Sequence, residues 1–150
     1  MEILKPKKLI YRINVKEMWN NSIVKIPINK KYLKIKSIKS KHTESSISYR
    51  IEYGNKSIVY SGDTDYSKEI IKISNNADLL ILECSFPESK KVKNHLTPSL
   101  CGEIATKANV KKLVLTHFYP ECDKVNIKKQ CSKAYKGKII LAKDYMVIVV

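Results

Sequence analysis

The stretch from residue 62 to residue 142 alternates strand patterns with helical patterns, and this alternation constrains the fold more than any other feature. Short apolar runs read "LLILE" at 79–83, "KLVLT" at 112–116 and "KIILA" at 138–142. Continuous apolar runs of this kind are typical of parallel strands that are buried on both faces. The order of strands and helices predicts an α/β fold with a largely parallel sheet, right-handed crossovers and helices packed against it.

The segments between these runs carry helix signals. "DYSKEIIKISNN" at 65–76 places isoleucines at helical spacing behind an opening Asp and Ser, which predicts a short helix. Thr97 can cap a second helix with Pro98 at its first position. A weaker helix is expected near 124–135.

The remaining patterns indicate strands of a different kind. Residues 47–53 alternate apolar and polar side chains, and Gly54-Asn55 followed by "KSIVYS" predicts a β-hairpin. "KYLKIKSIKSK" at 31–41 has the two-residue period of a surface strand, and "YMVIVV" at 145–150 is predicted to be a closing strand. We expect one domain over 1–150, in which 1–41 forms surface strands and 42–150 forms the α/β part.

The composition bounds the class of protein. The chain has 150 residues, 43% of them hydrophobic, and a formal net charge of +15, which suits one globular domain. Arginines stand only at 12 and 50, so lysine carries the charge; a nucleic-acid surface and a compositional bias toward lysine remain equal alternatives. No apolar run approaches the roughly 18 residues of a membrane span, and "MEILKPKKLIYR" lacks a signal-peptide core. We expect a soluble, cytoplasmic protein without a membrane partner.

Four cysteines, at 84, 101, 122 and 131, include no C-x-x-C pair. This spacing supports neither a zinc ribbon nor a dithiol redox motif. The sequence therefore predicts buried free thiols.

Polar side chains follow three of the predicted strands at the point where each ends. Asp63 closes "VYSGDT", Glu83 lies in "LLILECS" and His117 lies in "KLVLTHF". Because ligands bind beyond the carboxyl ends of parallel strands, we expect these three side chains to share one edge of the sheet, beside the loop "NHLTP" at 94–98. A carboxylate and an imidazole at such an edge suit zinc, iron or manganese.

Each candidate residue has a structural and a functional interpretation. Asp63 either caps the following helix or holds a metal ion, and His117 is either a metal ligand or an ordinary hydrogen-bonded histidine. His95 precedes a helix N-terminus, where it either faces a phosphate or simply lies exposed on a loop. Glu83 is expected to be buried and paired with His95. Spacing alone favours a structural role for His42.

Taken in order, "HTESSISYRIE", "SIVYSGDT", "LLILECSFP", "NHLTP", "LVLTHF" and "IILAKDYMVIVV" resemble the C-terminal half of the metallo-beta-lactamase superfamily, in the ribonuclease Z-like branch. The similarity covers about 110 residues, from 42 to 150. It implies half of an αββα sandwich, with a mixed sheet and helices on one face.

The resemblance also implies a role for each site residue. Asp63 would bridge two metal ions, normally zinc with manganese or iron as alternatives, and His117 would hold one of them. His95 would assist proton transfer to the leaving group, Glu83 would orient His95, and His42 would line the substrate site. The implied activity is hydrolysis of a phosphodiester or another ester by a bridging hydroxide.

The sequence also departs from the family. Members carry an H-x-H-x-D-H motif that supplies most of the metal ligands, whereas this sequence has three histidines and no such motif. Zinc sites need at least three protein donors, so we expect the chain alone to bind metal weakly and to be inactive. One apolar sheet face should be exposed. It would be covered by a partner chain that carries the other half or by a second copy. The alternative is a non-catalytic basic remnant or subunit that binds nucleic acid.

Overall fold

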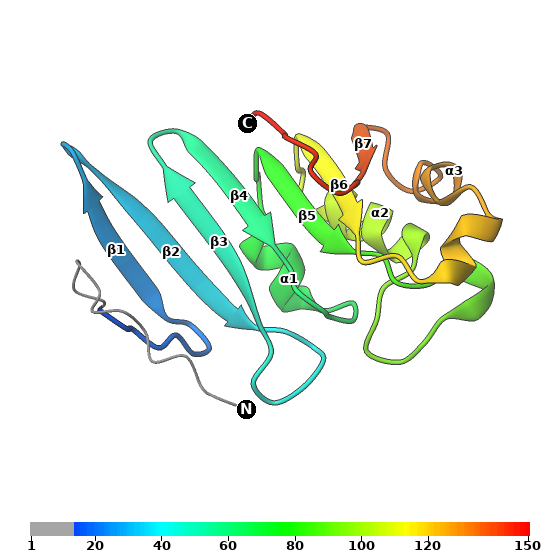
Figure 1. Ribbon diagram of the computed structural model, residues 1–150, viewed down its shortest axis with the longest axis horizontal. Helices are drawn as coiled ribbons and strands as arrows, with labels where there is room; N and C mark the ends of the chain where they lie inside the picture. The colour runs from blue at the N-terminus through cyan, green and yellow to red at the C-terminus, as the bar shows by residue number, and fades with distance from the viewer. Residues whose placement is uncertain (1–13) are drawn as a thin grey trace, which may run out of the picture.

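The computed structural model describes residues 14–150; residues 1–13, part of the segment predicted to form surface strands, lie outside the described residues. A single mixed sheet of seven strands runs in sequence order from β1 to β7 (Figure 1). β1 to β4 pair antiparallel, and β4 to β7 pair parallel. This arrangement confirms the predicted mixed α/β sheet. The strands are β1 Ile23–Ile28, β2 Lys31–Lys39, β3 Ile47–Tyr53, β4 Lys56–Tyr60, β5 Leu79–Glu83, β6 Lys112–Thr116 and β7 Lys138–Leu141.

Within residues 14–150, three α-helices lie on one face of the sheet (Figure 1). They are α1 Lys68–Ile73, α2 Pro98–Lys107 and α3 Ile127–Cys131, and two 3₁₀ turns cover Glu88–Lys90 and Pro120–Lys124. Each α-helix connects two parallel strands, which confirms the predicted order of strands and helices.

The helix ends follow the predicted caps in part. Ser67 caps α1, since its side chain accepts a hydrogen bond from the amide of Ile70. Thr97 occupies the N-cap position of α2 ahead of Pro98, but its side chain makes no capping hydrogen bond. The third helix is shorter than the predicted 124–135 because residues 120–124 form a 3₁₀ turn and α3 begins only after Asn126.

The predicted closing strand at 145–150 is wrong. The ladder between β6 and β7 ends at the pair Leu115 and Leu141, and the amide of Met146 then donates to the carbonyl of Lys143 in a turn. This turn takes the chain out of the sheet, so "YMVIVV" has no ladder to join. Tyr145 is fully exposed as a result.

The hydrophobic core lies between the sheet and the helices. Leu80 and Leu82 of β5 pair with Leu113 and Leu115 of β6, and all four side chains are fully buried. Ile104 of α2 is equally buried in the same core. At roughly 25 cal/mol per Å² of apolar surface, this layer supplies the main stabilising contribution to the fold.

The opposite face of the sheet carries apolar side chains without helices over it. The β3–β4 hairpin turns at Gly54 with φ of +60°, as predicted, and places Tyr49 opposite Tyr60 and Ile51 opposite Ile58. These side chains remain partly exposed, and Tyr60 is 48% exposed. The expected exposed apolar face is therefore present within residues 14–150.

The four cysteines are free and buried, as predicted. Burial raises the pKa of Cys122 to about 11 and that of Cys131 to about 12. Both thiols are therefore protonated at neutral pH and chemically inert. No helix within residues 14–150 is both long enough and apolar enough to cross a membrane.

Candidate metal centre

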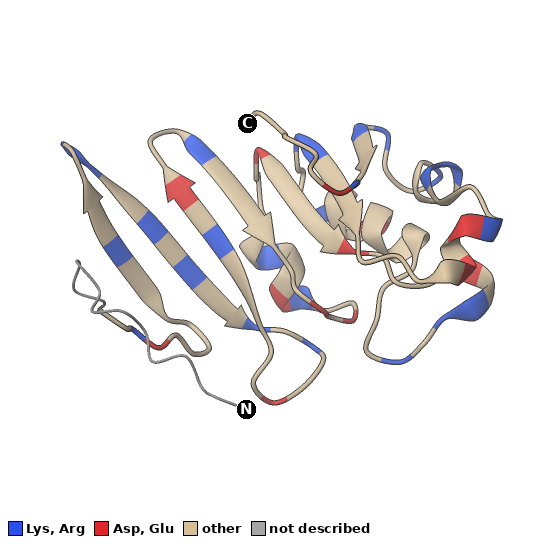
Figure 2. Cartoon of the chain, in the orientation of Figure 1, with Lys and Arg blue, Asp and Glu red and all other residues tan. Residues whose placement is uncertain are grey.

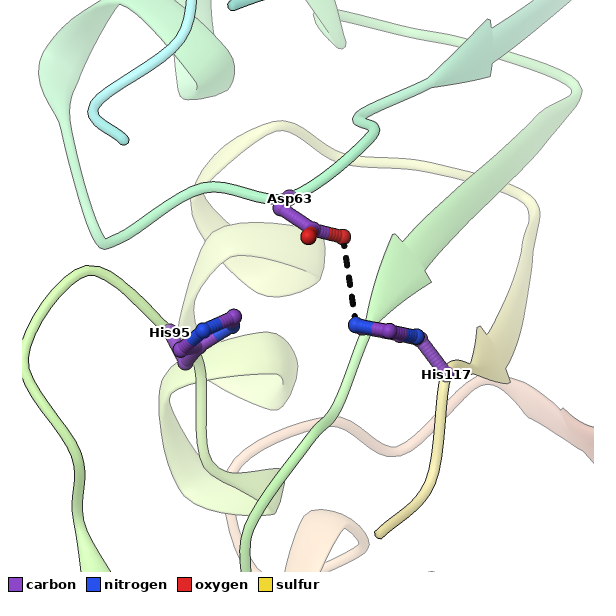
Figure 3. A group of neighbouring side chains, drawn as sticks. All are labelled: Asp63, His95 and His117. Atoms are coloured by element: carbon purple, nitrogen blue, oxygen red, sulfur yellow. Dashed lines mark ion pairs between the residues drawn. The ribbon is translucent and has the colours of Figure 1, made fainter. Parts of the chain in front are cut away.

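The carboxyl ends of β4, β5 and β6 bring the predicted polar residues together. Asp63 follows β4 after a short loop, Glu83 is the last residue of β5, and His117 directly follows β6. Asp63, His95 and His117 each offer a ligand atom within 4.8 Å of the others, and the three side chains point toward one another (Figure 3). The expected convergence at one edge of the sheet is confirmed.

The pair Asp63 and His117 has a spacing that fits a metal ion. Nε2 of His117 lies 3.4 Å from Oδ1 of Asp63, and both side chains are about 40% exposed. Two donors that each lie about 2.1 Å from a tetrahedral zinc ion are about 3.4 Å apart, so the pair matches one edge of such a site. Asp63 does not cap α1, since Ser67 holds that position. Its carboxylate is free to face the site.

The backbone at His117 has φ of +60°. Most other residues with positive φ, glycine aside, are asparagines, which tolerate this conformation well. Histidine, like asparagine, adopts this conformation more readily than most residues, at a cost on the order of 1 kcal/mol. It turns the imidazole at the end of β6 toward Asp63.

Glu83 is buried and accepts hydrogen bonds with both oxygens. Oε1 accepts from the amide of Thr64 at 3.0 Å and lies 2.9 Å from Nδ1 of His95. Oε2 accepts from the hydroxyl of Ser85 at 2.6 Å and from the amide of Leu96 at 3.1 Å. The predicted pair of Glu83 and His95 is thus present. Because a carboxylate faces Nδ1, that nitrogen carries the proton and Nε2 is left for the site.

His42 lies at the rim of the same site. Its Nε2 is 4.0 Å from Oδ2 of Asp63, and its ring centre is 5.1 Å from that of His95. Its Nδ1 lies 3.2 Å from the carbonyl oxygen of Asn94. His42 therefore lies beside the candidate metal ligands. The family resemblance predicts this position, whereas the spacing of His42 in the sequence favoured a structural role.

A third carboxylate, Asp65, was not predicted from the sequence and fixes the loop that carries His95. Oδ1 of Asp65 accepts from Nζ of Lys91 at 2.8 Å, and Oδ2 accepts from the amide of Asn94 at 3.2 Å. Burial alone would raise the pKa of Asp65, but Lys91 and the amide of Tyr66 outweigh it and leave the pKa below its usual value. Asp65 thus stays ionised and anchors the loop. The sequence feature that could have identified Asp65 is its position two residues after Asp63.

Aromatic side chains and a small cavity complete the site. The ring of Tyr119 stacks on Phe86 at 4.6 Å and lies 5.6 Å from the ring of His117. Neither ring was predicted as a site residue, although Phe86 lies in the quoted "LLILECSFP". A cavity of about 150 Å³ opens beside the cluster, large enough for a group of a few atoms. It is lined by Tyr60, Gly62, Asp63, Glu83, Thr116 and His117.

Comparisons with known proteins agree with this geometry. The profile of the beta-lactamase superfamily domain matches residues 11–118. A ribonuclease Z from Archaeoglobus fulgidus is 37% identical over 95 residues, which are 59% of this chain and 31% of that protein. The probable metallo-hydrolase YhfI from Bacillus subtilis is 30% identical over 109 residues, which are 71% of this chain and 45% of that protein.

Solved structures show the same relationship. The crystal structure of YhfI matches 80% of this chain and 50% of its own, with a TM-score of 0.70 and 29% identity. Human tRNase Z, short form, matches 79% of this chain and 45% of its own, with a TM-score of 0.61 and 25% identity. The chain thus spans between 31% and 50% of the length of these relatives. The sequence profile, the fold and the strand-end cluster together show that the chain belongs to the metallo-beta-lactamase superfamily, in its ribonuclease Z-like branch.

Proposed function

We propose that this chain forms part of a metal-dependent hydrolase that cleaves phosphodiester or related ester bonds. The observation that carries the proposal is the convergence of Asp63, His95 and His117 at the ends of adjacent parallel strands. Relatives named as ribonuclease Z and as a metallo-hydrolase support the same reaction class.

Asp63 and His117 are the residues that would hold a divalent ion. Their 3.4 Å spacing and their oxygen and nitrogen donors suit zinc, and also manganese or iron. When bound, such an ion supplies Lewis acidity and a water molecule of lowered pKa. The exposure of both side chains leaves room for substrate and for further ligands.

We assign proton transfer to the pair of Glu83 and His95. Glu83 holds Nδ1 of His95 from a buried position, so Nε2 points into the site and can exchange a proton with a leaving group. A carboxylate behind a histidine also occurs in metal ligation, so the two roles need separate tests. We assign substrate contact to His42, whose Nε2 lies 4.0 Å from Oδ2 of Asp63.

We also propose that the chain alone has too few protein donors to complete a metal site. A zinc site needs at least three protein donors, and a site for two ions needs more. The sequence has three histidines in total, and within residues 14–150 the one cluster of potential ligands is Asp63, His95 and His117. We therefore infer that another polypeptide segment with an H-x-H-x-D-H motif completes the site and that the chain alone binds metal weakly.

A complementation experiment tests this function. The chain is titrated with Zn²⁺ or Mn²⁺ against a competing chelator dye and assayed on bis(4-nitrophenyl) phosphate, alone and with the N-terminal half of YhfI. We expect weak binding and no turnover for the chain alone, and tighter binding with turnover for the mixture. Robust metal-dependent turnover by the chain alone would contradict the shortage of ligands.

Two variants separate the proposed roles in the mixture. Asp63→Asn should weaken metal binding and abolish turnover, whereas His95→Gln should retain metal and lose turnover by about 100-fold or more. Asp123→Asn, an exposed carboxylate outside the site, is the matched control and should change neither. Loss of metal from the His95 variant would instead identify His95 as a ligand.

A further inference from the structure

Cationic side chains form a band across the antiparallel part of the sheet, on the face that carries the helices. Figure 2 shows Lys and Arg side by side on β1, β2 and β3. Lys25 pairs with Lys34, and Lys36 pairs with Arg50 in the neighbouring register. Arg50 donates to the carbonyl oxygens of Ile73 and Asn75 near the end of α1, which places the band on the helix side.

A groove of about 780 Å³ runs beside this band, between the sheet and α1. Four cations and two carboxylates line it, so it has a net charge of two positive units. Amide and hydroxyl groups fill the rest of its polar lining. The charged lining residues are Lys36, Arg50, Lys68, Lys72, Glu52 and Glu69.

One carboxylate within the band is shared among three cations. Glu52 lies 2.7 Å from Nε of Arg50, 3.1 Å from Nζ of Lys36 and 3.6 Å from Nζ of Lys34. Burial alone would raise the pKa of Glu52, but the hydrogen bonds from Arg50 and Lys36 outweigh it and leave the pKa below its usual value. Three cations around one carboxylate leave an excess of positive charge for a ligand.

Three other lysines near this surface have no acidic partner within residues 14–150. They are Lys25, Lys68 and Lys72, and all three are exposed. Lys68 and Lys72 lie one turn apart on α1 and face the groove from the side opposite Lys36. Cations on both walls of a groove suit a chain of phosphates.

An exposed aromatic side chain lies beside the cations. Tyr32 is 62% exposed and shares a face of β2 with Lys34 and Lys36, because alternate residues of a strand point the same way. Tyr32 pairs with Pro27 of β1 in the same register that sets Lys25 opposite Lys34, so its ring lies on the cationic face. Unpaired bases stack on such rings, whereas the bases of a duplex are already stacked on one another.

We propose that the groove and the cationic face of β1–β3 bind single-stranded nucleic acid, with phosphates on the lysines and a base on Tyr32. This inference goes beyond the proposed hydrolase and does not depend on it, because these residues lie away from the ends of β4–β6.

The binding test uses the full chain and a fluorescently labelled 12-nucleotide oligo(U) or oligo(dT), with a chelator present so that no hydrolysis occurs. We expect both oligomers to bind, with a steep decrease in affinity as salt rises, and a blunt-ended duplex of equal length to bind more weakly. Absence of binding at low salt would overturn the proposal. So would tighter binding to phosphatidylserine vesicles than to either oligomer.

Two sets of lysine variants locate the site. Replacing Lys25, Lys68 and Lys72 with Gln should weaken binding roughly tenfold or more and reduce the log–log salt slope by about 2, since each lost phosphate contact removes about 0.7. Replacing Lys128, Lys129 and Lys133 with Gln removes the same charge from an exposed surface around α3 and should change binding little. Equal weakening in the two sets would show diffuse attraction and overturn the defined site.

A further variant separates stacking from charge. Tyr32→Ala should weaken binding to single strands roughly fivefold or more and leave the salt slope unchanged. Asp63→Asn should leave oligomer binding unchanged. Loss of binding in the Asp63 variant would place the nucleic acid at the metal centre and overturn the separate site.

Discussion

The two parts of this one sheet are stabilised in different ways. In β4–β7, parallel strands pack against three helices, and every hydrophobic residue that is buried within 14–150 lies at Val59 or later in the chain. In residues 14–58 the buried residues are all serines, at 37, 40, 48 and 57. A sheet can therefore be continuous while its hydrophobic core covers only part of it.

The serines show what replaces the core in the antiparallel part. The hydroxyl of Ser48 donates to the carbonyl oxygen of Ser61 at 2.7 Å and lies 2.7 Å from the hydroxyl of Ser40. These contacts join β3 to the loop that leads into Asp63. Hydrogen bonds of this kind contribute only about 1 kcal/mol each, so β1–β3 depends on its attachment to the packed part.

The largest expected difference comes from matched leucine substitutions. Leu113→Ala removes a fully buried side chain from the packed part and should cost about 3–5 kcal/mol in the free energy of unfolding. Leu33→Ala, on the partly exposed surface of β2, should cost less than about 1 kcal/mol. Urea denaturation measures both. Similar losses of stability in the two variants would show that β1–β3 has a hydrophobic core of its own.

Matched glutamate substitutions give the next largest difference. Glu83→Gln leaves at least one buried donor without its acceptor and should cost about 2–3 kcal/mol. Glu52→Gln affects ion pairs whose carboxylate is 26% exposed and should cost about 1 kcal/mol or less. Thermal unfolding at pH 7 and two salt concentrations separates them. Added salt should reduce the destabilisation caused by Glu52→Gln and leave that caused by Glu83→Gln unchanged. The opposite pattern would show that the contacts of Glu83, rather than those of Glu52, are screened by solvent.

Two glycines test close packing against backbone conformation. In Gly102→Ala the new Cβ would lie 2.7 Å from the carbonyl oxygen of Cys131 and would force α2 and α3 apart. We expect this variant to lose about 1–3 kcal/mol in the free energy of unfolding. Gly54→Ala meets only Nζ of Lys31 at 3.7 Å, so its cost of about 1 kcal/mol comes from φ of +60° alone. Urea midpoints of the two variants provide the comparison. Gly54→Asn is the control, because asparagine tolerates positive φ and should recover part of the loss.

The difference between the two parts also explains which predictions from the sequence succeeded. Strands such as 79–83 and 112–116 were predictable because burial on both faces imposes a continuous apolar run. The pattern at 145–150 is equally apolar but does not form a strand. Hydrophobicity indicates that a segment can join a sheet, whereas only the fold determines that a turn at Lys143–Met146 carries it out of the ladder.

The candidate site was predictable for a related reason. Asp63, Glu83 and His117 each lie at or just after the carboxyl end of a strand, so the parallel topology brings them to one edge. Asp65, Lys91 and Asn94 could not be found in this way. Their contacts join residues 26 and 29 positions apart through a loop that has no regular period.

The smallest effect that we predict concerns the attachment of β5 to β4. Oδ2 of Asp78 accepts from the amide of Ser57 at 2.8 Å and from its hydroxyl at 3.1 Å, while Oδ1 accepts from Nζ of Lys111 at 2.8 Å. The hydrogen bond from Lys111 lowers the pKa of Asp78 from 3.8 to about 2. Burial opposes this decrease, and the hydrogen bonds from Ser57 add to it. That decrease corresponds to about 2.4 kcal/mol. Because the Lys111 side chain is 70% exposed, we expect solvent screening to leave about 1 kcal/mol.

The sign of this pH dependence follows from the lowered pKa. The folded chain binds the proton less readily than the unfolded chain, so the stabilisation is present above about pH 4 and is lost as the pH falls from 4 toward 2. Asp78→Asn should therefore cost about 1 kcal/mol at pH 7 and have little effect near pH 2. Urea denaturation of the variant across this range, with the exposed Asp123→Asn as control, measures the difference. A loss for Asp78→Asn that does not change with pH would show that shape, rather than charge, joins β5 to β4.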